Sequence, residues 1–246
     1  IDLRNFTGTC NSQVFETAPK DGATLWLPRT GSFKLNDVFG RTGNTYNFVV
    51  YPGSIGEEAV YGMQTLSEQV AAMEKNYAEP FKIVAGINAS YYNTTTDKPT
   101  GAFVMEGIDV TTESEGNGYS FFAVLKDGTY MIGAKGEYSS YKGQIQEAIG
   151  GYHHIVKDGS VVSGLDKVTL YPRQTLGLTA DGKLILMTAD GSQAPTTVGT
   201  TIHEQAEIMK ALGCVEAIHL DGGNSATFGV IPEGSDKFVT KNSPSG

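Results

Sequence analysis

The sequence repeats Asp-Gly between apolar or β-branched segments, and this repeat constrains the fold more than any other feature. The pairs begin at Asp127, Asp158 and Asp181, within FFAVLKDGTYMIG, HHIVKDGSVVSG and LGLTADGKLILMTADG. A tight primed turn needs positive φ at its central residues, and Asp-Gly tolerates that conformation. The middle of the chain is therefore predicted to consist mostly of antiparallel β-hairpins.

Two segments show helical periodicity, and each leads into an apolar strand. TLSEQVAAMEKNY begins at Thr65 and has Glu68 in the capping-box position. TIHEQAEIMKALG begins at Thr201 and has Glu204 in the same position. Gly213 is the expected C-cap residue of this second helix.

The hairpins and helices together predict one α+β domain over residues 1–246, with a mixed, largely antiparallel sheet and two main helices. The 246 residues, of which 39% are hydrophobic, suffice for a sizeable core. Residues 1–61 carry scattered strand signals, and TTESEGNGYS, residues 111–120, is polar and is predicted to form a surface loop.

Charge and cysteine content exclude several classes of protein. Lys and Arg total 18 against 27 Asp and Glu, so the net charge is −9 and nucleic acid is not an expected partner. No stretch approaches the roughly 20 apolar residues of a transmembrane helix. Cys10 and Cys214 match no metal or redox motif, and a buried free thiol at Cys214 is favoured over a disulfide between the two.

The segment AIHLDGGNSATFGV places an acid and two glycines at the end of an apolar strand. Asp221 is the first candidate for a catalytic carboxylate, and Gly222 and Gly223 allow a ligand to approach the backbone. Asn224 and Ser225 follow as small polar groups that fit substrate binding. The alternative is an ordinary turn aspartate, because Asp-Gly recurs along this chain.

Four further polar residues are candidates, each with a structural alternative. Glu204 and Asp190 are candidate catalytic carboxylates, although Glu204 is also explained by the capping box and Asp190 by an Asp-Gly turn. Asn88, at a strand end beside two tyrosines, is a candidate for binding sugar, and its alternative is a turn asparagine. Arg173 offers a fork of donors that suits a phosphate, although most arginines are simply solvated.

The histidines favour a structural interpretation. His153, His154 and His219 are each expected to be buried and hydrogen-bonded, with His219 on the same strand face as Asp221. No metal-ligand spacing appears, and no metal or other cofactor is expected.

Several motifs together resemble the phosphodiester glycosidase family. They are INASYYNTTTDKPTGAFV, YPRQTLGLTADGKLILMTADG, GTTIHEQAEIMKALGCVEAIHLDGGNSATF and VTKNSPSG, all within residues 80–246. The family's motifs fall on Asn88–Tyr92, Pro172–Gln174, Ala189–Gly191, Glu204 and Leu220–Ser225. The sequence departs from them at Ala89, Ser90, Gln174, Asn224 and Ser243.

The resemblance implies a hydrolase that cleaves between the anomeric carbon and the phosphate of a glycosyl-1-phosphodiester. Asp221 would then lie near the anomeric carbon and Arg173 on the phosphate, while Asp190 or Glu204 would activate water and Asn88 would hold sugar hydroxyls. The expected partner is a sugar phosphate or glycan, and an N-acetylglucosamine-like sugar is one candidate.

The same resemblance implies a bacterial protein in an extracytoplasmic location, secreted or at the cell surface, and a final strand after Gly246. Two other functions stay open at this point. The domain could bind carbohydrate without catalysis, or it could serve as an interaction domain of a cell-surface protein.

Overall fold

The computed structural model describes residues 47–50, 61–76 and 83–245, except for single gaps at 106, 112, 196 and 233. Cys10 and the strand signals predicted before residue 47 lie outside these ranges. The helices are α1 (Leu66–Asn76), α2 (Glu113–Gly116), α3 (Tyr138–Tyr141) and α4 (Ile202–Ala211). The strands are β1 (Asn47–Val50), β2 (Tyr61–Gln64), β3 (Ala85–Ile87), β4 (Phe103–Met105), β5 (Ile108–Asp109), β6 (Phe121–Leu125), β7 (Tyr130–Gly133), β8 (Ile145–Gly150), β9 (His154–Lys157), β10 (Ser160–Val161), β11 (Arg173–Thr179), β12 (Leu184–Ala189), β13 (Cys214–Leu220), β14 (Phe228–Val230) and β15 (Val239–Thr240).

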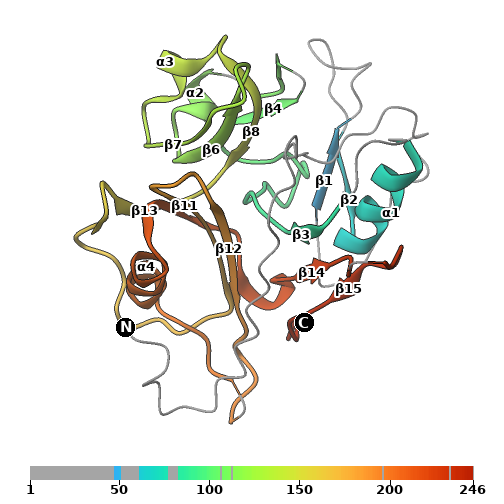
Figure 1. Ribbon diagram of the computed structural model, residues 1–246, viewed down its shortest axis with the longest axis vertical. Coiled ribbons are helices and arrows are strands. Elements are labelled where there is room, and N and C mark those ends of the chain that lie inside the picture. Colours follow the sequence, from blue (N-terminus) through green and yellow to red (C-terminus); the bar gives the residue numbers. More distant parts are fainter. Residues whose placement is uncertain are drawn as a thin grey trace.

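Two five-stranded sheets form most of the structure. Their strand orders are β5-β4-β8-β6-β7 and β10-β9-β13-β11-β12, and β15-β14-β3 and β1-β2 form smaller sheets. Figure 1 shows β4, β6, β7 and β8 at the top in green, with β11, β12 and β13 below them and α4 beside β13. The predicted α+β class with two main helices is confirmed, and every pairing between named strands in the described residues is antiparallel.

The main core lies where the two five-stranded sheets face each other. Phe122 and Val124 of β6 contribute from one sheet, and Leu176 and Leu178 of β11 from the other. Because side chains alternate along a strand, the intervening residues of β11 face α4 instead. At Gly177, for example, an added Cβ would lie 2.6 Å from the Met209 Cε of that helix. Helix α4 therefore covers the outer face of the lower sheet.

The three Asp-Gly hairpins form as predicted, but only one has the predicted turn. Asp158 and Gly159 both have positive φ, at 49° and 70°, as a primed two-residue turn requires. At Asp127 and Asp181 the loops have three residues, and only the glycine has positive φ. The amide of Gly128 donates to the Leu125 carbonyl, and that of Gly182 to the Thr179 carbonyl. A turn followed by a left-handed glycine gives the same hairpin with one more residue.

Both predicted capping boxes are present. The amide of Thr65 donates to Glu68 Oε2 at 3.0 Å, and that of Thr201 donates to Glu204 Oε2 at 2.8 Å. The reciprocal bonds, from each glutamate amide to the threonine hydroxyl, are also made. Gly213 has φ of 88° just after α4, as a C-terminal glycine should.

The prediction of a surface loop at residues 111–120 is wrong in part. Residues 111–120 are not simply a surface loop, because they contain the short helix α2 and both Thr111 and Ser120 are buried.

Cys214 is a buried free thiol, and burial raises its pKa to about 11. Among the described residues, no helix has the length and apolar content to cross a membrane.

Candidate active site

The pairing of three adjacent strands brings the charged candidates to one edge of the lower sheet. Strand β11 runs antiparallel to β12 and β13, and its first residue, Arg173, pairs with Ala189, the last residue of β12. Gln174 pairs with Leu220, the last residue of β13. Asp190 and Asp221, which directly follow these two strands, therefore lie on either side of the start of β11.

Two glycines allow the chain to close around Pro172 at this edge. A Cβ on Gly191 would lie 2.8 Å from the Pro172 nitrogen, and one on Gly222 would lie 2.7 Å from the Pro172 oxygen. The Gly223 amide donates to that same oxygen at 2.8 Å. Gly222 is thus required by close approach, since its φ of −137° is open to any residue.

Asp221 lies in a setting unlike that of a turn aspartate. Burial raises the pKa of its carboxyl group to about 7, and a hydrogen bond from the Gly222 amide lowers it only in part. Its own backbone amide donates to the Ala89 carbonyl at 2.7 Å, which ties the end of β13 to the segment after β3. A carboxyl group with this pKa can accept or donate a proton near neutral pH.

Arg173 is held firmly yet keeps donors for a ligand. Its Nε donates to the Thr200 carbonyl at 3.0 Å and its Nη2 to the Thr169 carbonyl at 3.1 Å. Its Nη1 lies 3.3 Å from Nε2 of His219. These three bonds use three of the five N–H groups of a guanidinium, so two make no hydrogen bond within the described part of the chain.

The contact with Arg173 also determines the protonation state of His219. Arginine can only donate, so Nε2 of His219 must be the acceptor and the hydrogen must be on Nδ1. Burial, with the charge of Arg173, lowers the pKa of His219 to about 3, which agrees with a neutral ring. The prediction of a buried, hydrogen-bonded histidine is therefore confirmed at this position.

The other two histidines match the prediction to different degrees. His154 is hydrogen-bonded as predicted, with its Nε2 pairing with the Glu216 carboxylate, and its side chain is only 10% exposed. His153, just before β9, is exposed rather than buried, although its carbonyl accepts from the His219 amide of β13 at 2.8 Å. Burial of part of the ring and the positive charge of Arg173 lower the pKa of His153.

Tyr91 belongs to the site although the sequence did not single it out. Its ring centroid lies 6.2 Å from that of His219. Burial and the negative charge of Asp221 raise the pKa of Tyr91 far above its usual value, while Arg173 acts in the opposite direction. The phenol is therefore neutral and within electrostatic reach of both charged groups. The sequence signal that could have identified Tyr91 is its position three residues after the candidate Asn88.

Asn88 is buried behind the site. Its Oδ1 accepts hydrogen bonds from the Thr227 amide, at 2.8 Å, and from the side chain of Gln174. Only 2% of the Asn88 surface is exposed, and Gln174 is fully buried. Gln174 also donates to the Thr227 carbonyl at 3.1 Å. Asn88 thus fixes the chain that follows Asp221 through its Oδ1.

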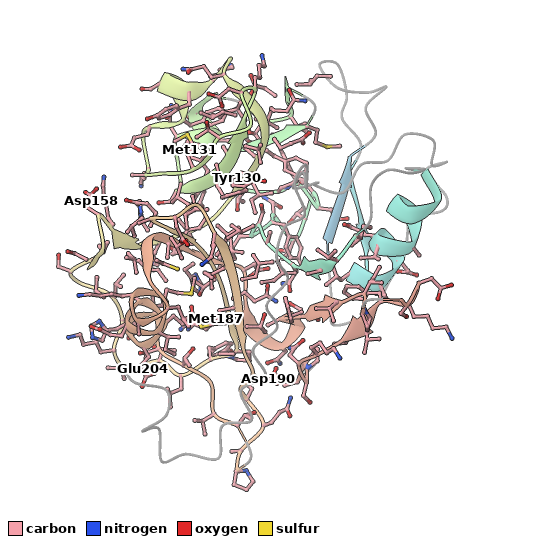
Figure 2. All side chains as sticks on the ribbon, in the orientation of Figure 1. Tyr130, Met131, Asp158, Met187, Asp190 and Glu204 are labelled. Atoms are coloured by element: carbon pink, nitrogen blue, oxygen red, sulfur yellow. The ribbon has the colours of Figure 1, made fainter. Side chains whose placement is uncertain are left out.

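Glu204 and Asp190 also have structural partners. Figure 2 shows them well apart, Glu204 on α4 and Asp190 beyond the end of β12. Glu204 closes its capping box. The Asp190 carboxylate accepts from Asn242 Nδ2 at 2.8 Å and from the Ser243 amide at 2.9 Å, so it fastens the C-terminal segment to the sheet edge.

The residues after Asp221 form a short turn. Gly223–Ser225 is a single 3-10 turn, in which Asn224 is exposed and Ser225 is partly buried. The Ser245 hydroxyl donates to Asn224 Oδ1 at 3.1 Å, so the C-terminal segment contacts this turn as well. In the described residues, no three acidic, histidine or cysteine side chains are grouped so as to hold a metal ion.

Comparison with known proteins decides the family. Residues 81–246, more than half of the chain, match the phosphodiester glycosidase family. The chain belongs to that family. The resemblance carried by the sequence motifs is thereby confirmed for the phosphodiester glycosidase domain.

Two relatives of known name are similar to this phosphodiester glycosidase domain. The human N-acetylglucosamine-1-phosphodiester alpha-N-acetylglucosaminidase is 24% identical over 199 residues, which cover 73% of this chain and 36% of the relative. The mouse protein of the same name is 25% identical over 160 residues, covering 57% of this chain and 30% of the relative. The chain therefore spans about a third of the length of these relatives.

Solved structures share the fold. The catalytic domain of the zebrafish N-acetylglucosamine-1-phosphodiester alpha-N-acetylglucosaminidase has a TM-score of 0.58 at 22% identity, covering 82% of this chain and 66% of that one. A hypothetical protein from Synechocystis has a TM-score of 0.50 at 11% identity, covering 81% of this chain and 54% of that one. These likenesses support the α+β fold of the phosphodiester glycosidase domain.

Proposed function

We propose that this chain hydrolyses glycosyl-1-phosphodiesters at the bond between the anomeric carbon and the phosphate oxygen. The observation that carries the proposal is the pair formed by Asp221 and Arg173 at one sheet edge. Asp221 is a largely buried carboxyl group with a pKa near 7, and Arg173 is an anchored cation with two N–H groups to spare. Membership in the phosphodiester glycosidase family supports the reaction class.

In the proposed reaction, the two remaining N–H groups of Arg173 bind the phosphodiester anion. The bond between anomeric carbon and phosphate oxygen breaks, and its electron pair leaves with the phosphate. A phosphate monoester has a second pKa of about 6, so it departs at neutral pH with little need for a proton. The sugar carries the developing positive charge, which the Asp221 carboxylate stabilises. Water then adds to the anomeric carbon and gives its proton to Asp221.

Neighbouring neutral side chains surround Asp221 and Arg173 without adding charge. The neutral His219 accepts from Arg173 without adding a second positive charge, and the neutral Tyr91 lies beside both. We assign positioning roles to Asn88, Glu204 and Asp190, because their side-chain oxygens already accept hydrogen bonds from the protein. This assignment differs from the expectation that Asp190 or Glu204 activates water.

The substrate's sugar follows from the relatives and from the turn after Asp221. The human and mouse proteins are named for N-acetylglucosamine-1-phosphodiesters, so an N-acetylglucosamine-like sugar is the first candidate here. Gly222, Gly223, Asn224 and Ser225 are proposed to border it. Asn224 makes this turn bulkier than the family's glycine, so the turn is expected to contact the substituents of that sugar differently than in the relatives. The extracytoplasmic, bacterial setting stays a prediction.

The test is a panel of substrates that distinguishes recognition of the phosphate from recognition of the sugar. Methyl phosphodiesters of several 1-phosphorylated sugars are compared with aryl glycosides of the same sugars, and both free sugar and phosphomonoester are measured. We expect equal release of the two products from at least one phosphodiester. Cleavage of aryl glycosides alone would remove Arg173 from the proposal. Binding of sugar phosphates without turnover would favour the non-catalytic carbohydrate-binding alternative.

A further inference from the structure

Three tyrosines from separate segments form a continuous row beside the candidate active site. Tyr91 follows β3, Tyr119 precedes β6, and Tyr152 lies between β8 and β9. The ring centroids of Tyr91 and Tyr152 are 5.2 Å apart, and those of Tyr152 and Tyr119 are 5.6 Å apart. We call these three side chains the tyrosine platform.

The backbone beneath the platform is fixed. The Tyr152 amide donates to the His219 carbonyl at 2.8 Å, and the preceding Gly151 amide donates to the Ser120 carbonyl at 2.7 Å. The Tyr91 carbonyl accepts from the Thr100 amide at 2.8 Å. Backbone hydrogen bonds at or next to each tyrosine therefore hold the segments that carry the rings, which lowers the cost of ordering them around a ligand.

The platform is open to solvent at its centre. Tyr152 is 43% exposed, while Tyr91 and Tyr119 are partly buried. Elsewhere in the chain, by contrast, Tyr138 is fully buried against Phe121. An exposed ring between two others suits a ligand.

The row begins at the proposed reaction site and leads away from it. Tyr91 lies within electrostatic reach of Asp221 and beside the ring of His219. Tyr152 and Tyr119 come next in the row, so a ligand on them occupies a position beyond the sugar at Asp221. The face of a tyrosine is apolar while its hydroxyl can donate or accept, and this combination matches the C–H face and hydroxyl rim of a pyranose.

We propose that the tyrosine platform binds a second, neutral sugar ring. This ring belongs to the group that stays attached to the phosphate, not to the sugar cleaved at Asp221. This rests on the proposed function. Neighbouring rings are inclined by 48° and 36°, so the platform is stepped and follows a puckered pyranose better than a flat nucleobase. Its three members carry no formal charge at neutral pH, which fits a neutral sugar rather than a second phosphate.

The test measures binding without turnover. The Asp221→Asn protein is mixed with chitobiose, cellobiose, maltose, lactose and, separately, uridine monophosphate, and binding is followed by saturation-transfer NMR and titration calorimetry. We expect at least one disaccharide to bind. In that background Tyr152→Ala should weaken the binding about tenfold, whereas Tyr152→Phe, which keeps the ring, should stay within about twofold.

Ile108 of strand β5 provides a control of similar exposure. Ile108 in β5 is 44% exposed against 43% for Tyr152, and Ile108→Ala should leave sugar binding unchanged. Binding of uridine monophosphate in place of the disaccharides, no disaccharide binding, or full binding by Tyr152→Ala would each overturn the platform. Sugar binding by a protein that cleaves no phosphodiester would instead overturn the proposed function and leave the platform intact.

Discussion

Asp-Gly occurs both at the hairpin tips and at the end of β13, yet the aspartates behave in opposite ways. At the tips, Asp127 and Asp181 are solvent-exposed. Hydrogen bonding to Thr129 lowers the pKa of Asp127, and hydrogen bonding to Lys183 and Thr179 lowers that of Asp181. At the end of β13, burial raises the pKa of Asp221 to about 7.

The glycines differ for a related reason. Gly182, at a hairpin tip, has φ of 80° and open space around its Cα, so it is needed for its conformation alone. Gly222 has an ordinary φ and is needed because Pro172 leaves no room for a Cβ. The same dipeptide is thus an open turn in one place and, in the other, a tightly packed corner whose aspartate has a raised pKa. Burial by neighbouring strands makes the difference.

The largest expected effect is on catalysis. Asp221→Asn should lower kcat for a glycosyl-1-phosphodiester by about two to four orders of magnitude, because the amide cannot take a proton. Asp181→Asn, the matched change at a hairpin tip, should leave kcat unchanged. Sugar release is the measurement. Similar rates for wild type and Asp221→Asn would mean that the two aspartates do not differ chemically.

The same variant should change how stability depends on pH. The pKa of Asp221 rises from 3.8 to about 7 on folding, so wild type loses stability as pH rises between these values and the Asn variant does not. At about pH 4 the two should unfold alike, and at about pH 8 Asp221→Asn should be the more stable by up to about 4 kcal/mol. Thermal unfolding across this range tests it. If the stabilities of the two proteins changed in parallel with pH, the raised pKa of the Asp221 carboxyl group would be contradicted.

Arg173→Lys tests the second charged group of the sheet edge. Lysine keeps the charge but lacks the fork that holds Thr200, Thr169 and a ligand together. We expect kcat/KM for phosphodiesters to fall about tenfold to a hundredfold, with little change for any aryl glycoside that is cleaved. An equal loss on both substrate classes would place Arg173 on the sugar instead of the phosphate.

The smallest effects separate the two glycines. Gly182→Ala should cost about 1 to 2 kcal/mol of stability through its positive φ, with kcat unchanged. Gly222→Ala should cost about 1 to 3 kcal/mol through overpacking and should also lower kcat, because it displaces Asp221 or Pro172. Chemical denaturation and sugar release are measured on both. If Gly222→Ala keeps full activity, close approach at Pro172 is not what positions Asp221.

Particular residues show why the local elements could be predicted from the sequence and the arrangement of the site only in part. Capping boxes and hairpins depend on neighbours within a few positions, so Thr201, Glu204 and Asp158 could be interpreted from the sequence. The candidate set included Asp221 and Arg173, which strand pairing brings to one sheet edge. Tyr119 and Tyr152 could not be found in this way, because their partners come from distant segments and one lies in a stretch that was predicted to be a surface loop.

The sequence by itself determined the local elements, the family and the identity of the charged residues, since these follow from short-range pattern and from motifs. Only the tertiary structure decided which of the carboxylates has a raised pKa. Antiparallel pairing on both sides of β11 brought Asp190, Arg173 and Asp221 to one edge. There, hydrogen bonds from the C-terminal segment occupied Asp190, whereas burial without a compensating charge raised the pKa of Asp221. Desolvation depends on the whole surrounding fold, so no short segment encodes it.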